Sequence, residues 1–305
     1  MPKFSIIIPV YNVEEYIERT LKSVFNQSEK DFEVILVNDG STDKSIEIAK
    51  NFDVKVINIK HSSVSEARNV GAKEAKGEYL VFLDSDDYWD KNLLKKLKQS
   101  LHNAPDLVRF QVRTITDKNE SVDYNEQTFE GKNGEEAFQI ICTFHFVESI
   151  WCYAIKRKYY EAEKFSFKKG TIHEDFGLTP LIIIKAKKVN CINYIGYNYY
   201  RRSGSIMNTP DYSWTKRKVS DFYKHYLYLN KEIDKTDVNK NIFKSFIANS
   251  MLMKICELNW KDYLNYKKKL KEKNIYNNLL NDTLTRKIKK ELLKISPKLY
   301  YRFIK

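Results

Sequence analysis

The chain has 305 residues, of which 42% are hydrophobic and 30% charged, a composition typical of a soluble globular protein that can bury a core. It contains no run of 18 apolar residues, so we expect no transmembrane helix. Residues 1–12 lack the long apolar region of a signal peptide, which indicates a cytoplasmic protein. The four cysteines are too widely spaced for a zinc site and are expected to be reduced core residues: Cys142, Cys152, Cys191 and Cys256.

The formal charge of +13 is concentrated in the last third of the chain. Residues 211–305 hold 23 Lys or Arg and 10 Asp or Glu, a difference of +13, whereas residues 1–210 hold 30 of each. A basic surface suits nucleic acid, anionic lipid or an acidic substrate, and a lysine-rich composition on solvated helices explains it equally well. No nucleic-acid reader motif accompanies the charge, so nucleic acid is not an expected partner.

The first hundred residues alternate between strand and helix patterns. Strands are expected at 4–10, 32–37, 54–59 and 79–83, and helices at 13–27, 44–51, 65–76 and 93–101. This alternation predicts an α/β fold with a mostly parallel sheet that is covered by helices on both faces.

The pattern changes after residue 105. Strands are expected at 106–116, 149–156 and 189–200, a loop or hairpin at 120–136 and a helix at 176–186. From residue 211 onward the pattern is helical, with lysines between the apolar positions. We expect these helices to pack on the rest of the protein up to about Trp260, and contact of residues 267–305 with an anionic membrane stays open.

An acidic turn follows the strand expected at 79–83. Asp84, Asp86 and Asp87 come directly after this apolar run, and ligands of open parallel sheets lie at the carboxyl ends of the strands. Carboxylates so close together repel one another unless a cation lies between them, and their oxygens suit Mg²⁺ or Mn²⁺. The other interpretation is a turn with a helix cap before residue 91.

The usual phosphate-binding glycine motifs are missing from the chain. Neither the dinucleotide fingerprint Gly-x-Gly-x-x-Gly nor the loop Gly-x-x-x-x-Gly-Lys is present. A metal ion and side chains must therefore hold any phosphate.

Three stretches of the first 90 residues resemble glycosyltransferase family 2, the inverting enzymes with the GT-A fold. They read SIIIPVYNVEEYIERTLKSVFNQ, VILVNDGSTDKS and SEARNVGAKEAKGEYLVFLDSDDYW. IHEDFGLTP and YNYYRRSGSIMN resemble, less closely, the acceptor-side motifs of non-processive bacterial members. The processive Gln-x-x-Arg-Trp motif is missing, which argues for the addition of one sugar per encounter.

The resemblance implies three regions. Residues 1–105 are expected to form the nucleotide-sugar-binding half and 106–210 the acceptor-binding half of one GT-A domain, followed by a basic helical C-terminal region at 211–305.

The resemblance also implies roles for residues of the donor site. Pro9 and Tyr11 would border the base of the nucleotide, Asp39 would accept a hydrogen bond from it, and Arg68 would face the nucleotide. A packed turn, a helix cap and a surface ion pair are the respective structural alternatives. Further donor contacts are expected from Ser85, Asp87, Arg202 and Ser205.

The metal and the base follow from the same resemblance. Asp86 would bind Mn²⁺ or Mg²⁺ directly, and Asp84 would meet the ribose or metal-bound water. Asp175 would be the base that takes the proton of the acceptor hydroxyl, and the like charge of Glu174 would raise its pKa. These two acids could instead be ordinary acids of a first helical turn, and His173 is a rival base.

The expected partners are a UDP-sugar and a saccharide or lipid-linked glycan acceptor, as in capsule, lipopolysaccharide, teichoic acid or glycoprotein glycan synthesis. Such acceptors would place the protein in the cytoplasm, with peripheral contact at the inner face of the plasma membrane left open. A homodimer is left open too. The alternatives are a nucleotidyltransferase, disfavoured because Pro9–Glu14 is no glycine-rich loop, and a non-catalytic partner subunit that stabilises or anchors another transferase.

Overall fold

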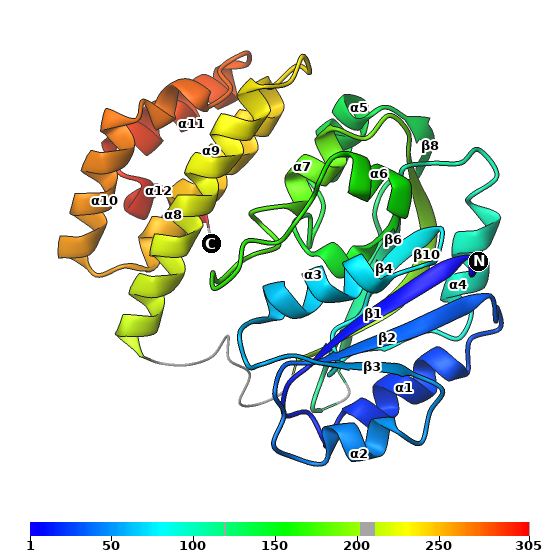
Figure 1. Cartoon of the computed structure of the whole chain (residues 1–305). Coiled ribbons are helices and arrows are strands. Elements are labelled where there is room, and N and C mark those ends of the chain that lie inside the picture. Colours follow the sequence, from blue (N-terminus) through cyan, green and yellow to red (C-terminus); the bar gives the residue numbers. More distant parts are fainter. Residues whose placement is uncertain (119, 202–210, 305) are drawn as a thin grey trace. The chain divides into compact units, whose positions relative to one another are not determined.

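The structure, a computed structural model, describes residues 1–118, 120–201 and 211–304. The chain divides into two compact units, unit 1 (residues 1–208) and unit 2 (residues 209–305), and each is described by itself (Figure 1).

Within its described residues, unit 1 contains one ten-stranded mixed sheet in the order β3-β2-β1-β4-β9-β6-β10-β5, with β7 paired to β6 and β8 to β10. The strands are β1 (Phe4–Val10), β2 (Phe32–Asn38), β3 (Lys55–Asn58), β4 (Tyr79–Phe82), β5 (Tyr88–Trp89), β6 (Leu107–Thr116), β7 (Ser121–Tyr124), β8 (Phe129–Lys132), β9 (Tyr153–Lys156) and β10 (Val189–Arg201). The helices are α1 (Ile17–Phe25), α2 (Ser45–Ala49), α3 (Val64–Glu74), α4 (Leu93–Gln99), α5 (Gly134–Ile141), α6 (Arg157–Ala162) and α7 (Thr179–Ile184), with a 3₁₀ turn η1 (Ile150–Cys152).

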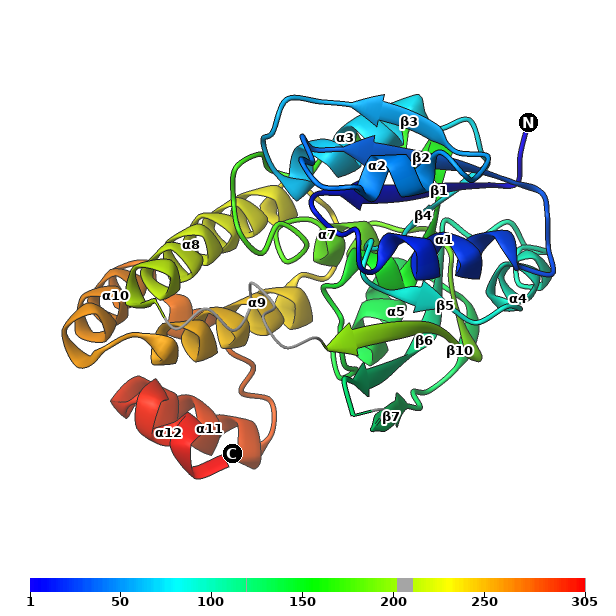
Figure 2. The ribbon, with the colours of Figure 1, turned by 90° about the horizontal axis from the view of Figure 1, so that it is seen from below.

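The parallel pairing of β1 with β2, β2 with β3 and β1 with β4 sets the position of the site. The chain moves outward from β1 to β3 and then returns to the other side of β1 to form β4. Because such crossovers are right-handed, α1 and α2 lie on one face of these strands and α3 on the other (Figures 1 and 2). The direction of winding reverses between β1 and β4, and their carboxyl ends are therefore the place where such sheets bind ligands.

A glycine allows α3 to lie directly against β1. A Cβ atom at Gly71 would come within 2.4 Å of Ile7 Cγ2, so a larger residue does not fit without moving the strand or the helix. Ile7 is fully buried, as are the other central residues of β1. Arg68 lies one turn before Gly71 on the same side of α3, so this close packing carries Arg68 to the carboxyl end of the sheet.

The predicted mixed sheet with flanking helices and a helical C-terminal region is confirmed, but several boundaries differ. The predicted helix at 176–186 is wrong at its start, because α7 begins at Thr179 with Pro180 in its first turn and residues 174–178 form turns. The loop or hairpin expected at 120–136 contains β7, which pairs with β6, then β8 and the start of α5. β5 and α6 were not predicted.

No disulfide joins the four cysteines, and the core position predicted for them is wrong for two. Cys152 and Cys191 are buried, whereas Cys142 and Cys256 are partly exposed.

Unit 2 consists of helices around a core of its own. They are α8 (Tyr212–Asp234), α9 (Asn241–Lys254), α10 (Trp260–Glu272), α11 (Leu284–Ile295) and α12 (Pro297–Ile304), with short 3₁₀ turns η3 (Ile255–Glu257) and η4 (Ile275–Asn278). The apolar face of α8 is buried at Phe222, Tyr226, Leu229 and Ile233. Among the helices that the structure describes, none is long and apolar enough to cross a membrane.

Candidate active site

Side chains of α1 bind the backbone of the acidic turn after β4. Arg19 Nη2 donates to the carbonyl of Asp86 at 2.8 Å. The hydroxyl of the next residue, Thr20, lies 2.9 Å from the carbonyl of Ser85 and 2.7 Å from that of Asp87. Consecutive residues of α1 thus bind three consecutive carbonyls, so the backbone of the turn is fixed against the helix.

Asp87 joins the same turn to β10. Its carboxylate is only 1% exposed and accepts the hydroxyl of Tyr197 at 2.6 Å and the backbone N–H of Tyr200 at 2.7 Å. Burial, together with the charges of Asp86 and Asp84, raises the pKa of Asp87 well above its ordinary value. Asp87 therefore positions the turn from within, while Asp84 and Asp86 are only partly buried.

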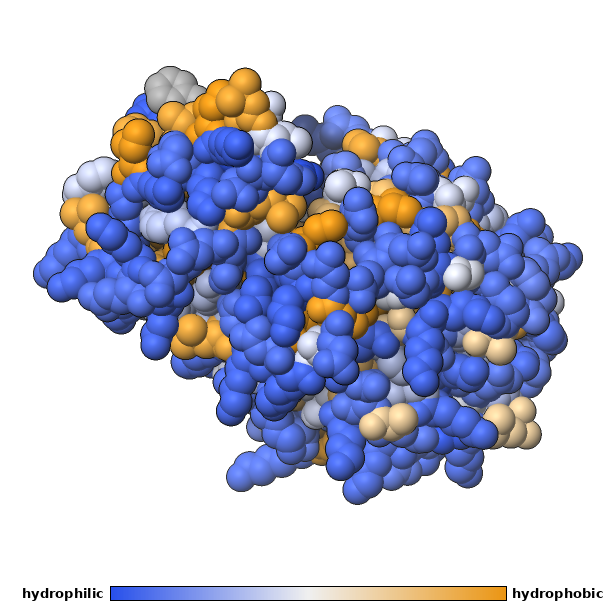
Figure 3. All heavy atoms as spheres, turned by 90° about the horizontal axis from the view of Figure 1, so that it is seen from above, coloured by the Kyte–Doolittle hydropathy of each residue, from blue (hydrophilic) through white to orange (hydrophobic). Residues whose placement is uncertain are grey.

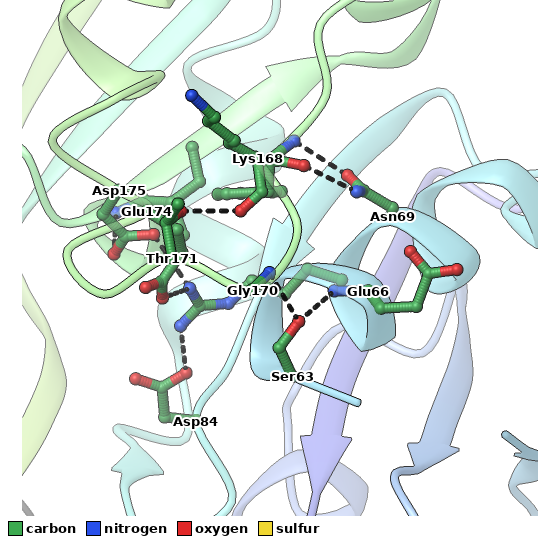
Figure 4. Close-up of polar contacts among 12 residues, drawn as sticks. Ser63, Glu66, Asn69, Asp84, Lys168, Gly170, Thr171, Glu174 and Asp175 are labelled. Carbon is green, nitrogen blue, oxygen red and sulfur yellow. Dashed lines mark hydrogen bonds and ion pairs between the residues drawn. The ribbon is translucent and has the colours of Figure 1, made fainter. Parts of the chain in front are cut away.

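Arg68 brings together carboxylates from distant parts of the chain (Figure 4). Its Nη1 donates to Glu174 Oε1 at 2.7 Å and to Asp175 Oδ1 at 2.8 Å, and its Nη2 donates to Asp84 Oδ1 at 2.7 Å. Burial alone would lower the pKa of Arg68, but the charges of Asp175, Asp84 and Glu174 raise it. The arginine side chain is only 3% exposed, so these are ion pairs of the protein interior.

The segment that carries Glu174 and Asp175 is attached to α3 by its backbone. The side-chain amide of Asn69 donates to the carbonyl of Phe167 at 2.9 Å and accepts its N–H at 2.8 Å. The ring of Phe167 lies 5.5 Å from the guanidinium carbon of Arg68. One turn of α3 therefore holds both the segment and the carboxylates that it delivers (Figure 4).

Asp175 is a carboxyl group with a strongly raised pKa. Burial raises its pKa to about 8, since it outweighs the effect of Arg68, and the charges of Glu174 and Asp84 act in the same direction as burial. Its second oxygen accepts the backbone N–H of Ile150 at 3.2 Å. The carboxylate is thus oriented from two sides and titrates far above an ordinary aspartate.

A second group of side chains lies at the ends of β1 to β3. The ring of Tyr11, which is 45% exposed, stacks on the ring of His61 at 4.2 Å. Asp39 is buried; it accepts the N–H of Ser62 at 2.7 Å, and its other oxygen lies 3.2 Å from His61 Nδ1. These contacts hold the loop after β3 against the ends of β1 and β2.

Many of the residues expected from the sequence fall into two groups. Arg68 with Asp84, Glu174 and Asp175 forms one directly bonded cluster, and Tyr11 and Asp39 meet at His61. Pro9 is buried at the end of β1, and Ser85 is buried in the acidic turn. Arg202 and Ser205 lie outside the described residues.

Sequence reasoning did not assign His61, Arg19 or Tyr197. His61 follows β3 at the same edge of the sheet as Asp39, and this position was the available signal. Arg19 lies 4.7 Å from the ring of Tyr88 and 4.2 Å from that of Tyr200, contacts between segments that no local pattern reveals.

The acidic turn fits a divalent cation only together with a ligand. Among residues 1–118, 120–201 and 211–304, no group of three or more His, Cys, Asp or Glu side chains is arranged to hold a metal ion. Mg²⁺ is commonly held by one or two carboxylates together with water and substrate phosphates. Asp84 and Asp86 supply two such oxygen donors, so the residues fit a cation that a diphosphate completes.

Comparison with known proteins gives relatives of one kind. The model of the family described as Glycosyl transferase family 2 matches residues 5–163. GlyG of Streptococcus pneumoniae, a glycosyltransferase, is 30% identical over 246 residues, which are 72% of this chain and 78% of GlyG. EpsJ of Bacillus subtilis, an uncharacterized glycosyltransferase, is 29% identical over 228 residues, 69% of this chain and 64% of EpsJ. Compared with GlyA of S. pneumoniae, the chain spans 32% of that protein's length.

Solved structures of TarS from S. aureus share the fold. TarS 1–349 in complex with UDP-GlcNAc aligns with a TM-score of 0.69 at 21% identity, covering 91% of this chain and 79% of TarS 1–349. The full TarS structure aligns with a TM-score of 0.64. Unit 1 has the GT-A architecture expected above, and the chain belongs to glycosyltransferase family 2.

Proposed function

We propose that the protein transfers one hexose or N-acetylhexosamine, with inversion, from a UDP-sugar to a saccharide or lipid-linked acceptor in the synthesis of a bacterial surface glycan. The observation that carries this proposal is the convergence of Asp84, Glu174 and Asp175 on Arg68. Asp84 would then lie beside the diphosphate and Asp175, with its raised pKa, beside the acceptor, and the guanidinium of Arg68 would bind both.

UDP is supported as the carrier by both the relatives and the site. TarS was solved with UDP-GlcNAc and with UDP. In this chain, Tyr11 offers an exposed ring on which a base can stack, and Asp39 offers a carboxylate beside it. A carboxylate oxygen suits the ring N–H of uracil, so we assign the base to this end of the sheet.

The proposed reaction uses Asp175 as the base. Ionised Asp175 takes the proton of the acceptor hydroxyl while the hydroxyl oxygen bonds to the anomeric carbon of the sugar. The bond between that carbon and the diphosphate breaks on the opposite face, and UDP leaves. Arg68 supplies positive charge next to the leaving group and also orients Asp175. Glu174 shares the guanidinium with Asp175 and helps to keep the pKa of Asp175 high.

Asp86, with Asp84, would hold Mn²⁺ or Mg²⁺, which when bound would neutralise the charge that develops on the departing diphosphate. Asp87 would act through position, since its carboxylate is bonded to Tyr197 and Tyr200.

Release of UDP from a panel of UDP-sugars, with Mn²⁺ or Mg²⁺ and with EDTA, tests this function. We expect metal-dependent release by the wild type and none by Asp86→Ala or Asp175→Asn, with circular dichroism unchanged. A matched control is Asp123→Asn, which removes a carboxylate from an exposed ion pair on β7. Near-normal turnover by both site variants would refute the assignment, and a wild type that binds UDP without turnover would favour the partner-subunit alternative.

We also propose that unit 2 contacts anionic lipid at the inner face of the plasma membrane. Leu284, Ile288 and Leu292 of α11 are 74%, 54% and 46% exposed, and α11 also carries several lysines. Figure 3 shows apolar side chains gathered at the surface over α11 and α12. Such a helix can lie in a membrane interface, where each nearby lysine contributes about 1 kcal/mol.

Sedimentation with phosphatidylglycerol vesicles at low salt tests this contact. We expect binding by the wild type, reduced binding by Leu284→Ser/Ile288→Ser, and no effect of Val122→Ser, because Val122 is an apolar residue on β7 that is as exposed as Ile288. Equal sedimentation of the wild type and the double variant would contradict the proposal. Light scattering measures whether the chain forms a homodimer.

A further inference from the structure

A continuous group of aromatic rings extends from the acidic turn. We call it the aromatic strip; it consists of Tyr124, His145, Phe146, Trp151, Tyr197 and Tyr199. Trp151 stacks on Tyr197 at 4.3 Å and on Tyr199 at 5.6 Å, and Phe146 lies 5.4 Å from Trp151. The ring of Tyr124 is 5.2 Å from Phe146 and 4.5 Å from His145.

The aromatic strip has an inner end that meets the active site. Tyr197 is fully buried and donates its hydroxyl to Asp87 in the acidic turn. Trp151 directly follows Ile150, whose N–H binds Asp175. The inner end of the strip is therefore bonded to the acidic turn, and Trp151 is one residue from the N–H that binds Asp175.

The outer end of the aromatic strip reaches solvent. Tyr124, Phe146 and Tyr199 are only partly buried, and His145 is exposed. A strip whose rings served only as core would be covered throughout, whereas this one is accessible to solvent at its outer end.

The outer rings are held by a buried ion pair that the proposed reaction does not use. The side chains of Arg109 and Glu126 are 0% and 5% exposed and form a 2.7 Å ion pair. Arg109 Nη2 also donates to the carbonyl of His145 at 2.7 Å, and the N–H of His145 donates to Glu126 Oε1 at 2.9 Å. Arg109 and Glu126 thus bind both backbone groups of His145.

The next residue has a strained backbone. Phe146 has φ of +52°, a conformation that a bulky residue rarely adopts and that costs about 1–3 kcal/mol. Such strain persists where the surroundings impose it, and it clusters at binding sites. Here it places a phenyl ring between Tyr124 and Trp151.

We propose that the aromatic strip is the acceptor subsite and binds a neutral pyranose ring of the saccharide acceptor. This inference rests on the proposed function. The acceptor hydroxyl must reach Asp175, and the strip runs from partly exposed rings to Tyr197, whose hydroxyl binds Asp87 in the acidic turn. The C–H face of a pyranose is apolar and stacks on such rings, while ligand sites in general combine aromatic walls with a few polar groups.

The composition of the strip selects this ligand over a phosphate. Its members carry no guanidinium or ammonium group, and Arg109 beside it is fully buried and paired with Glu126, while the charge of Arg201, at the end of β10, acts on Tyr199. A neutral sugar ring matches the rings of the strip themselves, and a phosphate of the same acceptor would lie outside them.

Saturation-transfer NMR tests the subsite with the methyl β-glycosides of glucose, galactose, N-acetylglucosamine and N-acetylgalactosamine, in the presence of UDP and Mn²⁺. We expect at least one glycoside to bind the wild type, with the strongest transfer at its ring C–H protons. Phe146→Ala and Tyr199→Ala should weaken its Kd about tenfold, whereas Tyr199→Phe, which keeps the ring, should stay within about twofold. Val122→Ala on β7, outside the strip, should bind like the wild type.

Calorimetric titration with UDP and Mn²⁺ separates this proposal from the proposed function. If the wild type binds UDP but no glycoside, or if the alanine variants bind the glycoside as the wild type does, the acceptor subsite is refuted while the donor site stands. If the wild type does not bind UDP, the proposed function fails, and the subsite fails with it. Phe146→Gly removes the ring while relieving the backbone strain, so weakened glycoside binding in this variant cannot come from poor folding at that position.

Discussion

Replacing Arg68 should destabilise unit 1 more than replacing an exposed arginine. The guanidinium makes three charge-assisted bonds of 2.7 to 2.8 Å and is 3% exposed. Removing one partner of a buried ion pair costs about 3–5 kcal/mol, because the remaining charge is left buried. Arg68→Ala should lower the free energy of unfolding by that amount. Arg68→Lys should lower it by about 2–3 kcal/mol, since one ammonium cannot bridge carboxylates as the planar fork does.

The loss should also depend on pH. Burial raises the pKa of Asp175 to about 8, whereas in the unfolded chain it is about 3.9, so between these values the folded protein holds a proton that the unfolded chain has lost. The contribution of Asp175 to the free energy of unfolding is therefore largest below about pH 4, and it decreases as the pH rises to about 8. Without Arg68 the pKa of Asp175 rises further, so the contribution of Asp175 to the free energy of unfolding keeps decreasing above pH 8. Relative to the wild type, Arg68→Ala should therefore lose more free energy of unfolding at pH 9.5 than at pH 6.

Urea unfolding followed by tryptophan fluorescence measures both effects. The chain has four tryptophans, and with Trp214→Phe and Trp260→Phe only Trp89 and Trp151 of unit 1 remain. The matched control is Arg113→Ala, whose ion pair with Asp123 is 40% and 37% exposed and should contribute less than about 1 kcal/mol. A loss at Arg68 no larger than at Arg113, or one that is the same at both pH values, would refute this reasoning.

Three more outcomes are expected. Transfer should be about tenfold faster at pH 9 than at pH 7, because Asp175 must be ionised to act as base, and a flat pH–rate profile would contradict this. Tyr197→Phe removes the hydroxyl that binds Asp87, so it should cost about 1–3 kcal/mol in urea unfolding and weaken Mn²⁺-dependent UDP binding; unchanged calorimetric affinity would argue against a positioning role. Gly71→Ala should cost about 1–3 kcal/mol, since its Cβ would lie 2.4 Å from Ile7, and a thermal midpoint equal to that of the wild type would exclude the close packing.

The strand and helix pattern was predictable where burial decides it. β1 and β4 are buried throughout, so their apolar runs end where the sheet ends and place Pro9 and Asp84 at its edge. The start of the helix expected at 176–186 was placed too early because Asp175 lies in a turn that its contacts with Arg68 and Ile150 stabilise, and those partners are distant in sequence.

The composition of the site was predictable only in part. Residue type and the family resemblance indicated Arg68, Asp84 and Asp175, but nothing in the sequence says that one guanidinium bonds to all three acids. The aromatic strip was invisible for the same reason, since Tyr124, Phe146 and Tyr199 come from three segments that only the folded sheet brings together. Their roles stay predictions until the variants are measured.

The attachment of the acidic turn to α1 has a consequence for the thermodynamics of metal binding. Arg19 and Thr20 already hold the carbonyls of Ser85, Asp86 and Asp87, so a cation that arrives there meets a loop with little conformational entropy left to lose. Most of the enthalpy that the cation gains by binding the carboxylates would then contribute to its binding free energy. In Thr20→Val the same ligands would stay, but the association would carry a larger entropic penalty.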